Sequence, residues 1–224
     1  MRKKLVACLL FTSLIANAQL KEKNDIEIAP CVGINSSNYY ESVSYTGGSN
    51  KALFTPFFGI TADFYVNNRW SLRTGLEYQT LGSSVYTSEL INNPQDNYYY
   101  RYFYESEKLN FLVIPIHANI HIGKSRKWHI NFGPTVSFLT GANFGGEKVE
   151  IDHLRKEHLG FGVGFGYRFN IHENLSLGIE HQEYISFTNN LNTFNSNGSF
   201  IGNIAGNFSV KAIFKLDSKS TNEE

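Results

Sequence analysis

The strongest pattern along the chain is an alternation of apolar with small or polar residues between Leu159 and Tyr184. A period of two is typical of a β-strand that has one apolar face. In the first half of the segment the opposite face is mostly glycine, and the apolar positions are Phe161, Val163, Phe165, Tyr167 and Phe169. Such a strand fits a barrel wall in which the aromatic face meets lipid and the glycines line a crowded interior.

The same alternation recurs along the rest of the chain. It predicts strands over residues 26–35, 54–66, 70–81, 108–122, 128–140, 159–170, 175–184 and 200–216. A tilted strand of about 11 residues rises roughly 28 Å, which matches the apolar band of an outer membrane. Trp70 and Trp128 both follow short turns directly, so we expect them at one membrane interface.

The connections between these strands alternate between short and long. Short turns are expected at 67–69, 123–127 and 172–174, and long loops at 36–51, 82–106, 141–158 and 185–199. Outer-membrane barrels have short periplasmic turns, longer external loops and no open sheet edge in lipid. The pattern therefore predicts an all-β fold: a closed antiparallel up-and-down transmembrane β-barrel of about eight strands.

The N-terminus reads as a secretory signal. Three basic residues, Arg2, Lys3 and Lys4, precede an apolar run over 5–15 and the small-residue site Ala16-Asn17-Ala18. We expect Sec-type export, cleavage near Ala18 and a place in the cell outer membrane. The expected organisation is a signal peptide at 1–18, a barrel domain at 19–216 and a polar tail at 217–224.

Composition narrows the function classes. The chain carries 13 Tyr and 18 Phe, and aromatic girdles at membrane interfaces use these residues. Its formal net charge is zero, which disfavours nucleic acid as a partner. After cleavage Cys31 is the only cysteine, so neither an intramolecular disulfide nor a Cys-based metal site is expected. No cofactor is implied.

Three segments resemble a known family, namely 109–116 (LNFLVIPI), 133–139 (GPTVSFL) and the glycine-rich hairpin at 160–182. They are similar to the PorT-like outer-membrane β-barrel family of Bacteroidota. The resemblance implies architecture and no catalytic residues. It also implies outer-membrane lipid, the barrel insertion machinery and an envelope or secretion-complex protein as partners. The chain departs from the family pattern at its last strand, which ends in Lys215-Leu216 and not in an aromatic residue.

The alternation places eight charged residues inside the barrel. They are four acids and four bases: Glu27, Asp63, Glu77, Glu180, Arg73, Arg168, Lys211 and Lys215. An interior of about eight strands is filled by side chains, so we expect a structural ion-pair network. A gated ion path is the alternative.

Three histidines, His117, His121 and His129, are also expected to face inward. Pairing across the 123–127 turn sets His121 opposite His129, within reach of a shared metal. No third strong ligand is evident, so we expect a hydrogen-bonded pair without metal. A metal site and a pH-sensitive switch remain as alternatives.

The best candidate binding surface is the aromatic run from 98 to 104. Its members are Tyr98, Tyr99, Tyr100, Tyr102, Phe103 and Tyr104. Aromatic side chains on an external loop stack on glycans or dock proteins. Alternatively, the neighbouring strands extend beyond the membrane and these residues form its upper aromatic girdle.

No catalytic signature occurs in the sequence. Only scattered groups such as His153, His158, His181 and Glu183 are available for an active site. We therefore expect a non-enzymatic outer-membrane barrel with a structural or interaction role, through its external loops or an envelope machine. A narrow channel for ions or small solutes and a soluble periplasmic ligand-binding barrel are the alternatives.

Overall fold

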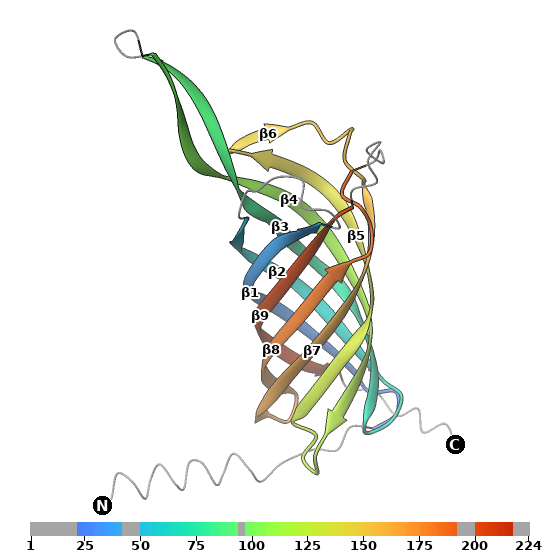
Figure 1. Ribbon diagram of the computed structural model, residues 1–224. Coiled ribbons are helices and arrows are strands. Elements are labelled where there is room, and N and C mark those ends of the chain that lie inside the picture. The colour runs from blue at the N-terminus through green and yellow to red at the C-terminus, as the bar shows by residue number, and fades with distance from the viewer. Residues whose placement is uncertain (1–21, 42–49, 94–96, 192–199, 217–224) are drawn as a thin grey trace, which may run out of the picture.

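The computed structural model describes residues 22–41, 50–93, 97–191 and 200–216 (Figure 1). In these ranges the chain forms antiparallel strands and no helix. The strands are β1 (Ile26–Glu41), β2 (Lys51–Tyr65), β3 (Trp70–Asn93), β4 (Asn97–Ile122), β5 (Trp128–Phe144), β6 (Glu147–Val149), β7 (Glu157–His172), β8 (Leu175–Ser186) and β9 (Ile201–Leu216). The described part of the chain thus has no helix able to cross a membrane.

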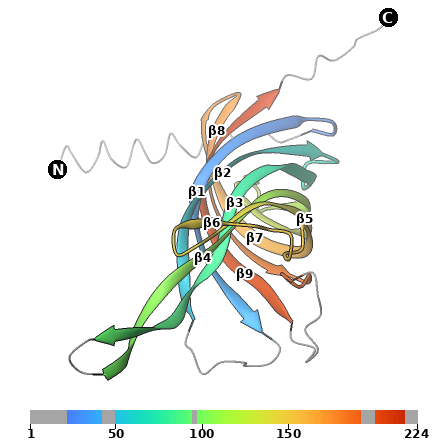
Figure 2. The same ribbon diagram turned by 90° about the horizontal axis from the view of Figure 1, so that it is seen from above.

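The sheet closes on itself. Neighbouring strands follow the order β4-β3-β2-β1-β9-β8-β7-β5, and β4 also pairs with β5. The short β6 pairs only with β5, so the ring has eight members and β6 lies over its opening (Figure 2). The predicted closed, up-and-down barrel of about eight strands is confirmed.

The two faces of the wall have inverted polarity compared with a soluble protein. Apolar side chains point outward, as with Val32 (63% exposed) and Phe165 (55%), while Asn131 is fully buried inside. Trp70 and Trp128, which follow short turns, are also exposed. An apolar outer face is what a wall surrounded by lipid requires.

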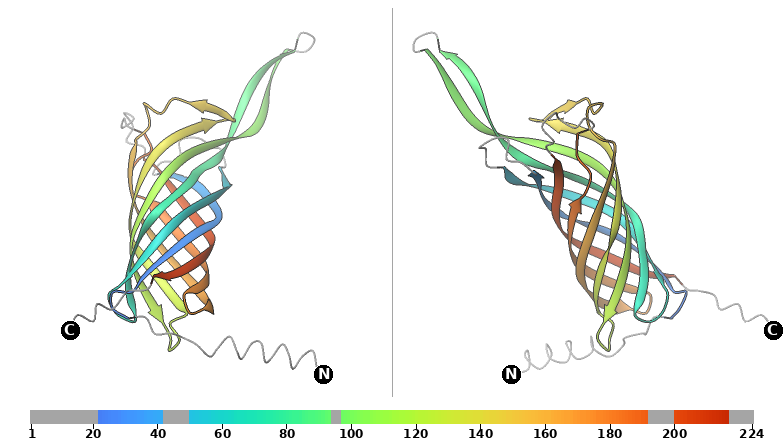
Figure 3. Two further views of the ribbon diagram at one scale, coloured as in Figure 1. Left: turned by 180° about the vertical axis from the view of Figure 1, so that it is seen from behind. Right: turned by 45° about the vertical axis from the view of Figure 1, so that its right-hand side comes forward.

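The sequence-based prediction of a long loop at 82–106 is wrong. β3 and β4 continue through this region as a two-stranded ribbon, with pairs running from Leu81–Leu109 to Asn93–Asn97. The ribbon projects well beyond the rest of the ring (Figures 1 and 3). Because both of its faces meet solvent at the far end, these residues show no apolar-polar alternation, and the pattern that identified the other strands is missing.

The other predicted long loops are also partly strand. β1 continues to Glu41 and β5 to Phe144, and β6 occupies part of the predicted 141–158 loop. The expected signal peptide and C-terminal tail lie outside the described residues.

The interior has two layers. The outer mouth, meaning the end of the ring opposite the three short turns, holds an apolar cluster. Its buried members are Leu81, Leu109, Phe111, Val113, Leu139, Ala142, Leu154, Tyr184 and Ala205. Toward the short turns the interior is polar and charged. Because a ring of eight strands is narrow, the side chains of both layers fill the interior and pack against one another.

Gly82 marks the point where the ribbon leaves the wall, and its backbone requires glycine. Its φ is +150°, and a Cβ there would stand 1.9 Å from the Glu107 carbonyl oxygen. The Ser37 hydroxyl hydrogen-bonds both the Gly82 N–H and its carbonyl, at 3.0 and 3.1 Å. The neighbouring backbone is thus fixed and has little room to yield.

We expect Gly82→Ala to lower the free energy of unfolding by about 1–3 kcal/mol, because it imposes a strained backbone and a backbone clash. The measurement is urea unfolding of the refolded protein in detergent, with gel mobility of boiled and unboiled samples as the test of folding. Gly141→Ala is the control, since its Cβ would meet only the Asn110 amide at 3.6 Å. Equal stability of the two variants would contradict the requirement for glycine at position 82.

Candidate functional site

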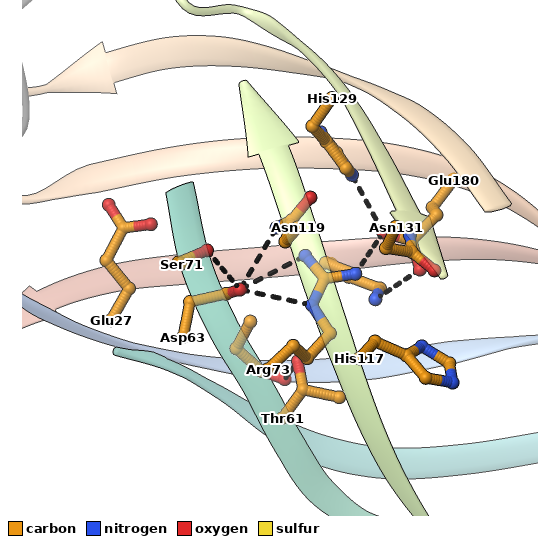
Figure 4. A network of polar contacts seen from close by, with 12 residues as sticks. Glu27, Thr61, Asp63, Ser71, Arg73, His117, Asn119, His129, Asn131 and Glu180 are labelled. Atoms are coloured by element: carbon orange, nitrogen blue, oxygen red, sulfur yellow. Dashed lines mark hydrogen bonds and ion pairs between the residues drawn. The ribbon is translucent and has the colours of Figure 1, made fainter. Parts of the chain in front are cut away.

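The centre of the interior is an ion pair between neighbouring strands (Figure 4). Asp63 on β2 lies directly opposite Arg73 on β3. Arg73 Nε and Nη2 donate to the Asp63 carboxylate at 3.1–3.3 Å, and Nη1 reaches across the lumen to Glu180 Oε2 at 2.5 Å. The guanidinium thus joins β2 and β3 to β8 on the far wall.

Glu180 joins three cationic or titratable groups. Besides Arg73, it accepts hydrogen bonds from Lys211 Nζ at 2.7 Å and contacts His129 Nε2 at 2.8 Å. These partners come from β3, β9 and β5, so a single carboxylate links four strands of the ring. Its side chain is 3% exposed, so the charge depends on these contacts rather than on water.

A second cluster lies nearer the short turns. Arg168 on β7 donates two hydrogen bonds to Glu27 on β1, at 2.8 and 2.5 Å, and the Tyr65 hydroxyl donates to Glu27 at 2.9 Å. Lys215 pairs with Asp25 at 3.0 Å. Sequence reasoning missed Asp25 because it precedes the first strand, where the alternation that assigns inward positions has not begun.

Of the eleven charged residues and histidines predicted to face inward, ten are at most 5% exposed: Glu27, Asp63, Arg73, Glu77, His117, His121, His129, Arg168, Glu180 and Lys211. Lys215 is half-buried. Glu77 accepts a hydrogen bond from Gln79 Nε2 at 2.6 Å. The ion pairs Glu27–Arg168 and Arg73–Glu180 join residues that are far apart in the sequence and that only the closed ring brings together. Asp63 and Arg73 instead pair across the β2–β3 hairpin.

His121 and His129 lie opposite each other on β4 and β5, with ring centroids 6.0 Å apart. Their hydrogen bonds are made elsewhere: His129 contacts Glu180, and His121 Nε2 contacts the Ser71 hydroxyl at 3.2 Å. The expectation of a hydrogen-bonded histidine pair is therefore wrong, because Glu180 and Ser71 lie nearer to the rings. Within the described ranges no group of three His, Cys, Asp or Glu is placed to hold a metal ion.

The external ribbon carries a row of tyrosines on one face. Tyr86 of β3 stacks on Tyr102 of β4 with centroids 5.6 Å apart and contacts Tyr104 at 5.2 Å, while Tyr100 and Tyr102 lie 6.4 Å apart. The Lys51 ammonium stands 3.9 Å above the Tyr104 ring. These four tyrosines are 40–60% exposed, so the row is a solvent-facing aromatic surface, called here the tyrosine face.

The six aromatic residues proposed from the sequence do not form one surface. Tyr100, Tyr102 and Tyr104 lie on the tyrosine face, whereas Tyr99 and Phe103 alternate with them and lie on the opposite face, where Arg101 contacts the Phe103 ring. The side chain of Tyr98 lies outside the described residues. Sequence reasoning missed Tyr86 because its place beside Tyr104 depends on the register of the ribbon.

A polar stripe separates the tyrosine face from the apolar outer wall. Five half-buried residues form it: Thr80, Ser84, Ser106, Lys108 and Asn110. At about 3.3 Å per residue, Tyr104 lies roughly 26 Å along β4 from Leu112, the next apolar position on the outward face of that strand. Along β3 and β4 the tyrosine face is therefore separated from the apolar band.

The four residues considered for an active site are scattered. His153 is exposed in the segment between β6 and β7, and His158 is buried against Phe111 inside the mouth, with ring centroids 4.9 Å apart. His181 and Glu183 pair at 2.7 Å on β8, at positions that alternate with the inward Glu180. The fold thus brings only His181 and Glu183 into contact.

We expect Glu180→Gln to destabilise the barrel by about 3–5 kcal/mol, because Arg73 and Lys211 would stay buried with one fewer negative charge. Urea unfolding in detergent micelles measures the effect. Glu89→Gln, at an exposed position on the ribbon, is the matched control and should change stability by less than about 0.5 kcal/mol. A Glu180→Gln variant as stable as the control would show that the network does not brace the ring.

Comparison with solved structures finds small outer-membrane barrels. Neisserial surface protein A is 15% identical, with 86% of this chain and 97% of that chain covered and a TM-score of 0.47. Ail of Yersinia pestis, in complex with the heparin analogue sucrose octasulfate, is 11% identical over 85% and 99%, with a TM-score of 0.41. The outer membrane protease OmpT of Escherichia coli is 9% identical over 89% and 100%, with a TM-score of 0.43.

At these levels of similarity the solved structures give no guide to the activity of this chain. A sequence comparison with curated proteins gives no match. A family model does match, over residues 17–192, and it describes an outer membrane protein beta-barrel domain. The closed ring, its apolar outer face and this match lead to one conclusion: the chain belongs to the outer membrane protein β-barrel domain family.

Proposed function

We propose that this protein is a non-enzymatic, non-conducting outer-membrane barrel that works through its external ribbon, by docking a protein of the cell envelope. The observation that carries the proposal is the tyrosine face, an exposed aromatic surface held beyond the apolar wall by two continuous strands. Tyrosine is enriched in protein interfaces because it offers a large apolar ring together with a hydroxyl group.

The free edges of the ribbon support a protein partner. In the described ranges no strand pairs with the outer edge of β3 beyond Ser84 or with that of β4 beyond Glu107. Unpaired N–H and C=O groups on an edge strand accept an added strand from another chain. Aromatic anchors beside a free edge provide side-chain contacts together with backbone pairing.

The contents of the lumen argue against a channel. The apolar cluster at the mouth and the ion pairs around Glu180 fill successive layers of an eight-stranded ring. A barrel of about eight strands is only wide enough for side chains. An ion would have to displace the packed side chains around Phe111 and the paired charges below them, at a high desolvation cost.

The proposal also covers the family subgroup, the partner complex and the export route. The segments at 109–116, 133–139 and 160–182 support membership of the PorT-like group of Bacteroidota, and hence a partner in an envelope or secretion complex. The signal pattern supports Sec-type export and cleavage near Ala18, followed by insertion into outer-membrane lipid by the barrel insertion machinery.

Site-specific photocrosslinking in cells tests the docking surface. A photoreactive phenylalanine analogue at Tyr102 should give a discrete adduct with a second protein, and Tyr100→Ser should reduce that adduct. The same analogue at Tyr78, on the barrel wall, is the control. Equal adduct patterns from positions 102 and 78 would refute docking on the tyrosine face.

Planar-bilayer recording tests the closed lumen. The purified protein should give no stepwise current, because the apolar layer around Phe111 blocks the lumen. Reproducible single-channel steps from samples with heat-modifiable gel mobility would instead support the alternative of a narrow channel.

A further inference from the structure

A pocket of about 330 Å³ opens at the outer mouth, beside the base of the ribbon, and its lining contains no residue of the lumen network or of the tyrosine face. Its lining includes Tyr39 of β1, Glu107 and Leu109 of β4, and Leu154 and Leu191 from the connecting segments. Binding sites for small molecules fall in a range of about 300–1,000 Å³ and are mainly apolar with a few polar groups. The volume of this pocket lies at the lower end of that range, and its lining combines apolar side chains with Glu107, His153 and three asparagines.

The floor of the pocket is closed. Leu109, Ala142 and Leu154 line it and are also members of the apolar cluster, whose Phe111 is 1% exposed. Leu154 and Leu191 form an antiparallel bridge that ties the segment after β6 to the segment after β8. The pocket is therefore a blind cup rather than the entrance to a path through the barrel.

The polar part of the wall is a tyrosine–carboxylate pair. The Tyr39 side chain is hydrogen-bonded to Glu107, and burial, together with the charge of Glu107, raises the pKa of Tyr39 well above its ordinary value. Tyr39 therefore stays protonated and donates its hydrogen to the carboxylate. A carboxylate offers about four acceptor sites, so this pair adds acceptor capacity and negative charge to the cup.

We propose that this cup binds a small apolar molecule that carries a hydrogen-bond donor at one end and no negative charge. The apolar body would lie against Leu109 and Leu154, and a hydroxyl or ammonium group would lie toward Glu107. An acid of the same length is disfavoured because its carboxylate would lie near that of Glu107, and like charges at close range repel each other. The inference is independent of what docks on the ribbon.

Three probes with the same chain and different heads test the proposal: 1-octanol, octylammonium and octanoate. The full-length barrel, in lipid nanodiscs and labelled at leucine methyl groups, is titrated and followed by NMR. Octanol and octylammonium should shift the Leu109 and Leu154 methyl signals saturably, and octanoate should bind at least about tenfold more weakly. The lipid-facing Leu159 and Leu177 (59% and 42% exposed) report partition into the bilayer instead.

Non-saturating shifts, equal at Leu109 and Leu177, would overturn the proposal because they would mean bilayer partition only. Saturable binding with no preference against octanoate would overturn the role of Glu107. Leu191→Trp, which fills the cup from its rim, should abolish the saturable shifts, whereas Leu159→Trp on the outer wall should not. If Leu191→Trp loses heat-modifiable mobility, the comparison of three probes on the unmodified chain decides alone.

Discussion

Pairing of β1 with β9 is the constraint on which the rest of this structure depends. Each backbone amide that faces hydrocarbon without a partner costs several kcal/mol, so a sheet in lipid must have no open edge. The pairs from Ile26–Leu216 to Glu41–Ile201 remove that edge by joining the first strand to the last. Once the ring is closed, each strand has one face toward lipid and one face toward a narrow interior.

Closure also determines what the interior must contain. The inward positions of eight strands face each other over short distances, which places charges from distant parts of the chain in contact. Glu180 meets Arg73, Lys211 and His129, and Glu27 meets Arg168 and Tyr65. A buried charge without a partner would be costly, so these contacts offset the cost of placing ionised groups inside the ring.

At its outer end the barrel differs in both its interior and its wall, because this end leaves the membrane. There the interior changes from ion pairs to the apolar cluster around Phe111, and the blind cup lies above it. The wall continues on one side only, as the β3–β4 ribbon (Figure 3). Binding surfaces are free to form at this end because its side chains need neither face lipid nor fill the lumen.

The sequence by itself determined the fold class and the inward or outward direction of most wall residues. A period of two in a strand requires only local backbone geometry, and an aromatic face opposite a glycine face is a local signal of a barrel wall. It also named the charged residues of the interior, since direction follows from alternation. Asp25 was missed because it precedes the alternating segment.

Tertiary structure decided everything that depends on register and on distance across the ring. The ion-pair partners of Glu180, the separate hydrogen bonds of His121 and His129, and the stacking of Tyr86 on Tyr102 are set by strand stagger and closure. The sequence raised the extension of β3 and β4 only as an alternative to a loop, because a two-stranded segment exposed on both faces needs no alternation. The mouth pocket was hidden, since its lining is assembled from segments that only the closed barrel brings together.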